Sequence, residues 1–230
     1  MSRMELQQNH WEQGTLLLLN GQLPPAPQLQ SLSARFRRVV AADGAAVAAV
    51  ENGVTPDAVI GDLDSVGGQR TNLEELGVTV IERPSQEEND FEKSLKWLIE
   101  QGETTVTIAG IGGGMIDHTL NNFSIVAKFA HKLQLRFLHE GSVGIVVVGD
   151  AQIPAVPGLR VSIIPLPAAT ITTIGLAWEL SNQQLAIGQR EGASNMAVAN
   201  LVSVRVHHGV AAVVVAGDSA ERARRANTRD

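Results

Sequence analysis

The sequence predicts two domains: an α/β domain with a parallel sheet and helices on both of its faces, followed by an all-β sandwich. Up to about residue 140, short apolar runs alternate with segments of helical periodicity, and the connections between them are short. Beyond that point only short β-branched runs remain, separated by Gly, Pro, Asn or Asp. We therefore expect domains at residues 1–140 and 141–217. The charged tail 218–230 has few apolar residues and is expected to be disordered.

Strands of the first domain are expected wherever an apolar run ends in turn-forming residues. They lie within residues 15–21, 37–45, 56–66, 77–84 and 104–110. In a parallel sheet the carboxyl ends of the strands share one edge, and ligands bind there. Asp43, Asp62, Asp64 and the segment 110–117 all follow apolar strands, so we expect them to gather on that edge.

Helices are expected between these strands, where apolar residues recur on one face. One begins near Pro27, and the alanine-rich segment after Asp43 stops at Gly53. The segment 89–102 places four apolar residues on one face and ends in a glycine that suits a helix C-cap. A further helix is expected at residues 118–130.

Strands of the second domain are expected at β-branched runs that Gly, Pro, Asn or Asp interrupts. These runs are GIVVVGD (144–150), LRVSIIPL (159–166), ATITTIG (169–175), AWEL (177–180), QQLAIG (183–188), VSVRVHH (202–208) and VAAVVVAG (210–217). Many short strands with turn signals between them indicate a small sandwich.

Composition excludes several classes of function. The 230 residues are 44% hydrophobic and carry a net charge of -6, so no basic field is present to attract nucleic acid. The absence of cysteine excludes disulfides, Cys-ligated zinc, iron–sulfur clusters and a thiol nucleophile. The opening segment is polar, unlike a signal peptide, and no apolar stretch approaches the ~18 residues of a spanning helix. We expect a cytoplasmic protein without a membrane partner.

Asp62 and Asp64 stand two positions apart, directly after an apolar run. Carboxylates so placed suit a hard cation such as Mg²⁺, which takes one or two of them together with substrate phosphates. An ordinary Asp-rich turn is the alternative. A phosphatase nucleophile is another, but that motif usually follows the first strand of its domain and continues with Thr, whereas Ser65 follows here.

Asp90 and Lys93 are three residues apart on an expected helix, so they share a face. A carboxylate and an ammonium together suit a magnesium-bound phosphate. A surface ion pair, or an aspartate that caps the helix, explains the same residues.

A glycine-rich loop runs from an expected strand into the helix that follows. Its glycines are Gly110, Gly112, Gly113 and Gly114. Backbone amides there can hold phosphate. The loop lacks the Lys-Ser/Thr of a P-loop, and Met115 stands where a dinucleotide motif has its third glycine. A tight turn with Asp117 as N-cap and a structural His118 is the alternative.

Trp178 lies in an expected β region, and Ser194 and Asn195 close a loop that contains glycine. An indole face with two small polar side chains can bind a flat, partly cationic heterocycle. A core tryptophan and a plain turn would also fit this segment.

Taken together, these segments resemble one family, thiamine pyrophosphokinase. The matching pieces are AADGA (41–45), PDAVIGDLDS (56–65), the segment from Gln86 to Lys93 with its ND-x-x-K, GGGMIDHTLNN (112–122), and TIGLAWEL (173–180) with GASN (192–195). Each piece is weak alone. Together, five pieces occur in the family's order and approximate spacing over roughly residues 38–215. That combination is specific for the family.

The resemblance implies a homodimer with active sites at the subunit interface, and the reaction of ATP with thiamine to give AMP and thiamine diphosphate. It implies that Asp62, Asp64 and Asp90 bind Mg²⁺ with the nucleotide phosphates, beside Asp43. Gln86 and Lys93 would contact phosphates.

By the same resemblance, Asp117 and His118 lie with Gly113 and Gly114 between nucleotide and acceptor. Either Asp117 or a metal ligand takes the proton of the thiamine hydroxyl. Trp178, Ser194 and Asn195 would contact thiamine, from the partner subunit.

Two positions depart from the family pattern. Met115 replaces an arginine of the glycine loop, and Ser85 stands where an aspartate is common. A thioether cannot supply the charge or the two-pronged donor of a guanidinium. Two further hypotheses therefore stay open: a pyrophosphokinase for another alcohol such as a pterin, and a non-catalytic binder of thiamine or nucleotide.

Overall fold

The computed structural model describes residues 11–64, 66–85 and 87–217. Gln86 and the tail 218–230, for which expectations were stated above, lie outside the described residues. The chain divides into two compact units, the first ending at His139 and the second beginning at Glu140. No helix in the described ranges is long and apolar enough to cross a membrane.

The first unit contains a parallel sheet with the strand order β6-β5-β1-β2-β3-β4. The strands are β1 (Thr15–Leu18), β2 (Arg38–Ala42), β3 (Ala58–Gly61), β4 (Thr79–Glu82), β5 (Thr105–Ala109) and β6 (Gln134–His139). The helices are α2 (Ala26–Ser33), α3 (Ala45–Glu51), α4 (Arg70–Glu75, after a 3-10 turn at Gly67–Gln69), α5 (Asp90–Glu100) and α6 (Ile116–Phe129). The expected α/β fold with a parallel sheet is confirmed.

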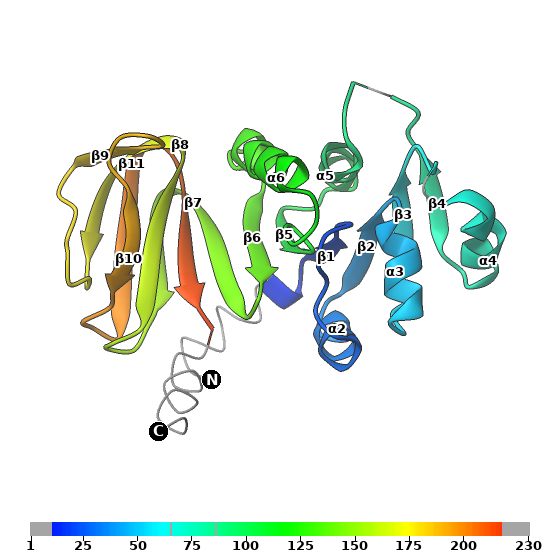
Figure 1. The fold of residues 1–230 in the computed structure, drawn as a ribbon, viewed down its shortest axis with the longest axis horizontal. Coiled ribbons are helices and arrows are strands. Elements are labelled where there is room, and N and C mark those ends of the chain that lie inside the picture. Colours follow the sequence, from blue (N-terminus) through cyan, green and yellow to red (C-terminus); the bar gives the residue numbers. More distant parts are fainter. Residues whose placement is uncertain (1–10, 65, 86, 218–230) are drawn as a thin grey trace. The chain divides into compact units, whose positions relative to one another are not determined.

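Helices cover both faces of this sheet, which explains why its central strands are buried throughout. Leu16 and Leu18 of β1 pack in one cluster with Leu29 of α2 and with the small residues of α3. Their neighbour Leu17, fully buried as well, points to the opposite face, because side chains alternate along a strand. Figure 1 shows α5 and α6 on one side of the sheet and α2 and α3 on the other.

The order of the strands creates a crevice at the carboxyl edge of the sheet. From β1 the chain proceeds outward through β2, β3 and β4, whereas β5 and β6 lie on the other side of β1. The loop after β1 leads to α2 and the loop after β5 leads to α6, on opposite faces. Ligands of open α/β sheets bind at such a switch point.

The second unit is antiparallel and has the strand order β10-β8-β11-β7, with β9 paired to β8. Its strands are β7 (Ser142–Pro154), β8 (Arg160–Ile174), β9 (Gln183–Ala186), β10 (Gly192–Met196) and β11 (Leu201–Ala216). This antiparallel unit confirms the expected all-β half (Figure 1).

The long strands of the second unit are interrupted near their middles, so each contributes to two layers. Register shifts in β11 fall between Val206 and Ala211, and Gly209 has a positive φ of 82°. One apolar cluster contains residues from both halves of these strands, for example Val161 and Val213 from one half and Ile171 and Val204 from the other. The two halves therefore enclose a common core, as in a sandwich.

Several local expectations differ from the structure. The runs at 159–166 and 169–175 form one continuous strand, β8, and the runs at 202–208 and 210–217 form one strand, β11. The AWEL segment (177–180), expected as a strand, is a loop, whereas Ser194 and Asn195, expected in a loop, belong to β10. Helix α6 begins at Ile116, two residues earlier than expected, which places Asp117 inside its first turn.

Candidate functional site

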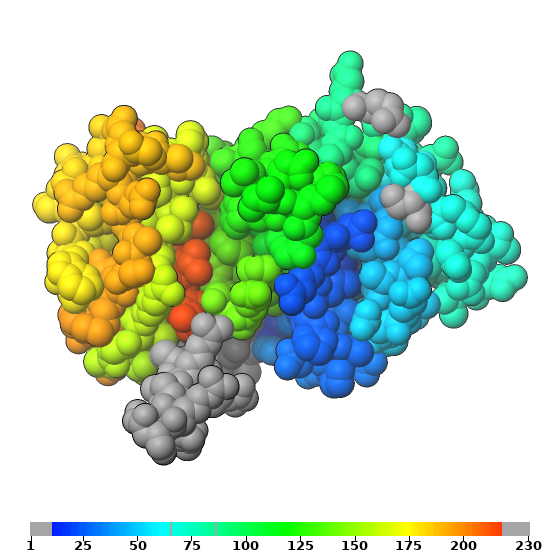
Figure 2. Space-filling model, viewed as in Figure 1, coloured from blue at the N-terminus to red at the C-terminus, as the bar shows by residue number. Residues whose placement is uncertain are grey.

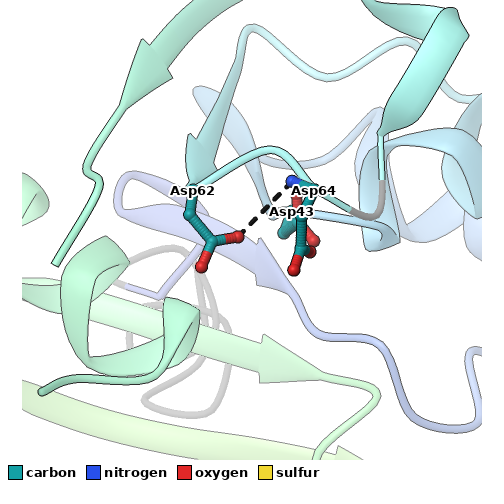
Figure 3. A group of neighbouring side chains, drawn as sticks. All are labelled: Asp43, Asp62 and Asp64. Carbon is teal, nitrogen blue, oxygen red and sulfur yellow. Dashed lines mark hydrogen bonds between the residues drawn. The ribbon is translucent and has the colours of Figure 1, made fainter. Parts of the chain in front are cut away.

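An acidic cluster lies at the carboxyl ends of two neighbouring strands. Asp43 follows β2, and Asp62 and Asp64 follow β3; one carboxylate oxygen from each lies within 4.8 Å of the others (Figure 3). The parallel pairing of Ala42 with Ile60 brings these strand ends together, and the Asp43 amide donates to the Ile60 carbonyl at 2.8 Å. The expected convergence of these residues on one edge of the sheet is therefore what the structure shows.

Asp43 is the buried member of this cluster. Its exposed fraction is 4%, and its Oδ1 atom is buried without a hydrogen-bond partner among the described residues. A buried carboxylate oxygen without a partner is costly, because it has lost its hydration and gained nothing in return. A cation held between Asp43, Asp62 and Asp64 would satisfy it. The three carboxylates are an all-oxygen donor set of the kind that hard divalent cations prefer.

Asp90, expected as the third metal ligand, lies beside this cluster and pairs with Lys93. The Lys93 ammonium lies 3.0 Å from Asp90 Oδ1 and 3.4 Å from Asp62 Oδ2, and the lysine side chain is only 2% exposed. Burial raises the pKa of Asp90, Lys93 opposes this, and the charges of Asp43 and Asp62 add to the increase. Burial also lowers the pKa of Lys93, but its two carboxylate partners outweigh that effect and raise it.

Gly61 brings Asp43 and Asp90 close together. A Cβ atom at this position would lie 2.8 Å from Asp43 Cβ and 3.1 Å from Asp90 Oδ1. No side chain fits there without displacing one of the two aspartates. Asp90 is therefore adjacent to the cluster, with Lys93 as its immediate partner.

A pocket of about 390 Å³ occupies the crevice between the loop after β1 and the loop after β5. It is lined by Leu19, Asn20, Gly21, Ala42, Asp43, Gly44, Asn89, Asp90, Phe91, Ile111, Gly112, Gly114, Met115, His118, Thr119 and Asn122. One end is acidic and the other is formed by the glycine loop and the start of α6. Figure 2 shows the surface of this helix region (green) directly beside the segment that follows β1 (blue).

The glycine loop is held against the loop after β1 by backbone contacts that only glycine allows. The Gly21 and Gln22 amides donate to the carbonyls of Gly110 and Gly112 at 3.1 and 2.7 Å. A Cβ on Gly21 would lie 2.3 Å from the Gly110 carbonyl oxygen, and one on Gly113 would lie 2.3 Å from Gln22 Cβ. These glycines allow the backbones of the two loops to approach each other closely.

The residues at the start of α6 divide between pocket and solvent. His118 and Met115 line the pocket, and the Met115 side chain is 64% exposed. Asp117 does not line it; its Oδ1 accepts a hydrogen bond from the backbone amide of His118 at 2.9 Å. That carboxylate therefore stabilises the helix N-terminus, where its charge is favourable.

Trp178, Ser194 and Asn195 gather on the second unit. Trp178 is 65% exposed, so it is not a core residue, whereas Asn195 is 8% exposed. The Asn195 side chain accepts from the backbone amide of Trp178 at 3.1 Å and donates to the carbonyl of Trp178 at 2.7 Å. Asn195 thus fixes the loop that presents the indole. Ser194 has a positive φ of 62°, and its hydroxyl accepts from Arg160 at 2.9 Å.

Two family models match the chain at the positions of these sites. One describes the catalytic domain of thiamin pyrophosphokinase and matches residues 29–137; the other describes its vitamin B1 binding domain and matches residues 152–211. The chain belongs to the thiamin pyrophosphokinase family. The acidic cluster and the glycine loop lie in the catalytic match, and Trp178, Ser194 and Asn195 lie in the vitamin B1 binding match.

Individual members of the thiamin pyrophosphokinase family are distant in sequence. Thiamine pyrophosphokinase 1 of Oryza sativa subsp. japonica is 23% identical over 155 residues, which cover 61% of this chain and 59% of that protein. Thiamin pyrophosphokinase 1 of Caenorhabditis elegans is 25% identical over 153 residues, with 61% and 62% covered. The chain therefore spans less than two thirds of either relative. A crystal structure of thiamine pyrophosphokinase from Bacillus subtilis superimposes with a TM-score of 0.73 at 21% identity, over 89% of this chain and 99% of that one.

Several residues that shape these sites were not anticipated from the sequence. Asn20 and Gly21 line the pocket, and their signal was the Asn-Gly pair that ends the first apolar run. Asn122 donates from Nδ2 to the Ile111 carbonyl at 2.9 Å and so ties α6 to the glycine loop. On the second unit, Glu179 accepts from the amides of the Trp178 loop, at 2.6 Å from Gly175. No pattern in the sequence indicated either contact.

Proposed function

We propose that this protein is a thiamine pyrophosphokinase, which transfers the pyrophosphoryl group of ATP to the hydroxyl of thiamine and releases AMP. The observation that carries the proposal is the Asp43–Asp62–Asp64 cluster beside a glycine-walled pocket, in a chain of this family. Carboxylates for a metal and free amides for phosphate are the parts that pyrophosphoryl transfer requires, because the reaction depends on positioning and charge neutralisation more than on covalent catalysis.

We propose Mg²⁺ as the cation of this site. Asp43, Asp62 and Asp64 would hold it, and the unpartnered Oδ1 of Asp43 supports that assignment. Bound there, the cation would neutralise the phosphate oxygens of ATP and make the β-phosphorus easier to attack. Lys93 holds Asp62 and Asp90 in place, at 3.4 and 3.0 Å.

The chain's own groups position the two substrates for an in-line displacement. Amides of the glycine loop and of the first turn of α6 can donate to phosphate oxygens, as helix N-termini commonly do. The thiamine hydroxyl oxygen forms a bond to the β-phosphorus, the bond from that phosphorus to the α-phosphate oxygen breaks, and AMP leaves. The hydroxyl proton passes to a carboxylate. Because Asp117 is engaged with its own helix and does not line the pocket, Asp43, the member of the acidic cluster that lines it, is the better placed acceptor.

We propose that thiamine binds against the exposed indole of Trp178. The thiazolium ring of thiamine is cationic, and a tryptophan face attracts cations more strongly than other aromatic faces do. Asn195 would act by fixing the Trp178 loop, and Ser194 has a hydroxyl proton left to donate because its oxygen accepts from Arg160.

The activity is tested by incubating the purified protein with ATP and Mg²⁺ and a panel of alcohols that includes thiamine and a hydroxymethyl pterin. We expect AMP to form only with thiamine, and an Asp62→Ala variant to lose activity by on the order of 10²–10³-fold. If AMP forms with the pterin and not with thiamine, the protein is a pyrophosphokinase for a different alcohol. If calorimetry shows that thiamine binds but no AMP forms, the protein binds thiamine without catalysing the reaction.

We also propose that the protein is a cytoplasmic homodimer in which one subunit supplies the acidic cluster and the other the Trp178 face. Exposed apolar side chains, among them Ile116, Leu120 and Trp178, support an association of copies. Light scattering gives the mass in solution. Mixing inactive Asp62→Ala protein with inactive Trp178→Ala protein should restore activity if the site is shared, and an inactive mixture of verified heterodimers would reject the shared site.

A further inference from the structure

The pocket has an unusual charge balance for a site that takes a polyanion. Among the described residues that line it, the ionisable side chains are Asp43, Asp90 and His118, and neither lysine nor arginine is present. Its other polar side chains are neutral, such as Asn20 and Asn89. A nucleoside triphosphate that entered this pocket without a metal would meet two carboxylates and, among the described residues of this chain, no permanent cation.

Two cations near this edge of the sheet, Lys93 and Arg83, are already engaged. The Lys93 ammonium is almost fully buried between Asp62 and Asp90. Arg83, which follows β4, places its guanidinium on Glu100 in an ion pair. Moving either group to a phosphate would break an existing pair and leave a carboxylate without its partner.

Met115 is the residue of the glycine loop at which a basic side chain would gain access to the pocket. It lines the pocket as the N-cap of α6, directly after the glycine loop, and its side chain is 64% exposed. A long basic side chain there would have both access to the pocket and freedom of conformation. A thioether offers neither charge nor a hydrogen-bond donor.

We propose that this pocket binds nucleotide polyphosphate only as its complex with a divalent cation, and that Met115 is the residue that makes the dependence strict. The inference rests on the proposed function. The metal held by the acidic cluster supplies the positive charge, and the neutral amides of the glycine loop and α6 supply the hydrogen bonds. Free ATP is repelled by Asp43 and Asp90.

The test measures binding, by isothermal calorimetry, of a non-hydrolysable ATP analogue to the full chain in Mg²⁺ and in EDTA. We expect the affinity to fall by at least about a hundredfold in EDTA, since two or more charge-assisted contacts are lost. AMP, which carries less charge, should change by less than about tenfold. An analogue that binds within about threefold in both conditions would overturn the inference, because a fixed cation must then be present.

The substitution Met115→Arg probes the residue itself. It should raise the affinity in EDTA by about 10- to 100-fold, the value of one charge-assisted contact, and by much less in Mg²⁺. The matched control is Ile116→Arg, which adds the same charge at an exposed neighbour that does not line the pocket, and it should gain less than about threefold. Equal gains in both variants would show that net charge alone is responsible and would refute the role of Met115.

Failure of this inference can be told apart from failure of the proposed function. If the analogue does not bind in Mg²⁺ to any variant, the nucleotide site itself is wrong. If it binds in Mg²⁺ and equally in EDTA, the nucleotide site stands and the strict metal dependence is refuted. The wild-type comparison needs no substitution, so a variant that fails to fold leaves it intact.

Discussion

Replacing Lys93 with methionine removes the buried ammonium that lies between Asp62 and Asp90. Methionine has nearly the same length and fills the same space, so the change isolates the charge. The lysine side chain is 2% exposed, and its Nζ atom lies 3.0 Å from Asp90 and 3.4 Å from Asp62. The pKa of Lys93 is raised, so its contribution to stability is complete below the unfolded pKa of about 10.4 and is lost as the pH rises through the folded value.

The magnitude follows from these distances. At an effective dielectric constant of about 20, unit charges about 3 Å apart attract by about 5 kcal/mol. Part of this is offset because the ammonium has left water, and removing one partner of a buried pair costs about 3–5 kcal/mol. Asp62 and Asp90 are 19% and 28% exposed, so water screens the charges that remain. We therefore expect a loss of about 2–3 kcal/mol, or a Tm lower by about 5–10 °C.

The assay is thermal unfolding at pH 7 with and without Mg²⁺. Bound metal supplies part of the missing positive charge, so Mg²⁺ should raise the Tm of Lys93→Met by more than that of the wild type. Lys96→Met is the matched control, because Lys96 lies on the same helix and pairs with Glu88 and Glu92 outside the cluster. Mg²⁺ should raise the Tm of Lys96→Met by the same amount as that of the wild type. A Lys93→Met protein as stable as the wild type would show that the buried ammonium does not stabilise the fold. Equal increases in Tm with Mg²⁺ in both variants would show that bound metal does not replace its charge.

Three further predictions concern the surroundings of the cluster. Gly61→Ala should displace Asp43 or Asp90 and weaken Mn²⁺ binding, followed by electron paramagnetic resonance, by about 10- to 100-fold; unchanged affinity would contradict the packing. Burial raises the pKa of Glu92, but its lysine partners lower it more, so Glu92→Gln should reduce the Tm at pH 7 and by progressively less as the pH falls below the unfolded pKa of about 4.3; a loss that does not change with pH would contradict the ion pairs. Asp117→Asn should reduce kcat by less than about tenfold; a loss above about a hundredfold would identify it as the proton acceptor.

The fold and the convergence of the aspartates were predictable because they follow from periodicity and topology. Apolar runs that alternate with helical segments require a parallel sheet, and parallel strands present Asp43 and Asp62 at one edge. The exposure of Trp178 also agrees with a binding role more than with a core role. The fold and the convergence of the aspartates follow from the direction of each strand, without any detail of side-chain packing.

The detailed pairing within the site was not predictable from spacing alone. Asp43, Asp62 and Asp64 form the cluster, and Asp90 lies beside it with Lys93 as its partner one helical turn further along. The sequence shows that Asp90 and Lys93 share a face. That Lys93 also reaches Asp62 depends on how α5 packs on β2 and β3.

The role of Asn195 shows a second limit of the same kind. Its position in a Gly-containing segment indicated a ligand contact, but its amide is engaged with the backbone of Trp178, 17 residues earlier. That contact depends on β10 pairing with β8, which turns an expected loop into a strand. Long-range pairing of this kind leaves no local signal.

We propose that this chain transfers the pyrophosphoryl group of ATP as one unit. Phosphorus-31 nuclear magnetic resonance of a reaction with ATP, Mg²⁺ and thiamine identifies every product in one measurement. We predict signals of AMP and thiamine diphosphate in equal amounts, and neither in the Asp62→Ala variant. Signals of ADP and thiamine monophosphate would contradict transfer of the pyrophosphoryl group as one unit. ATP unchanged after prolonged incubation with the wild-type protein would contradict the proposed activity.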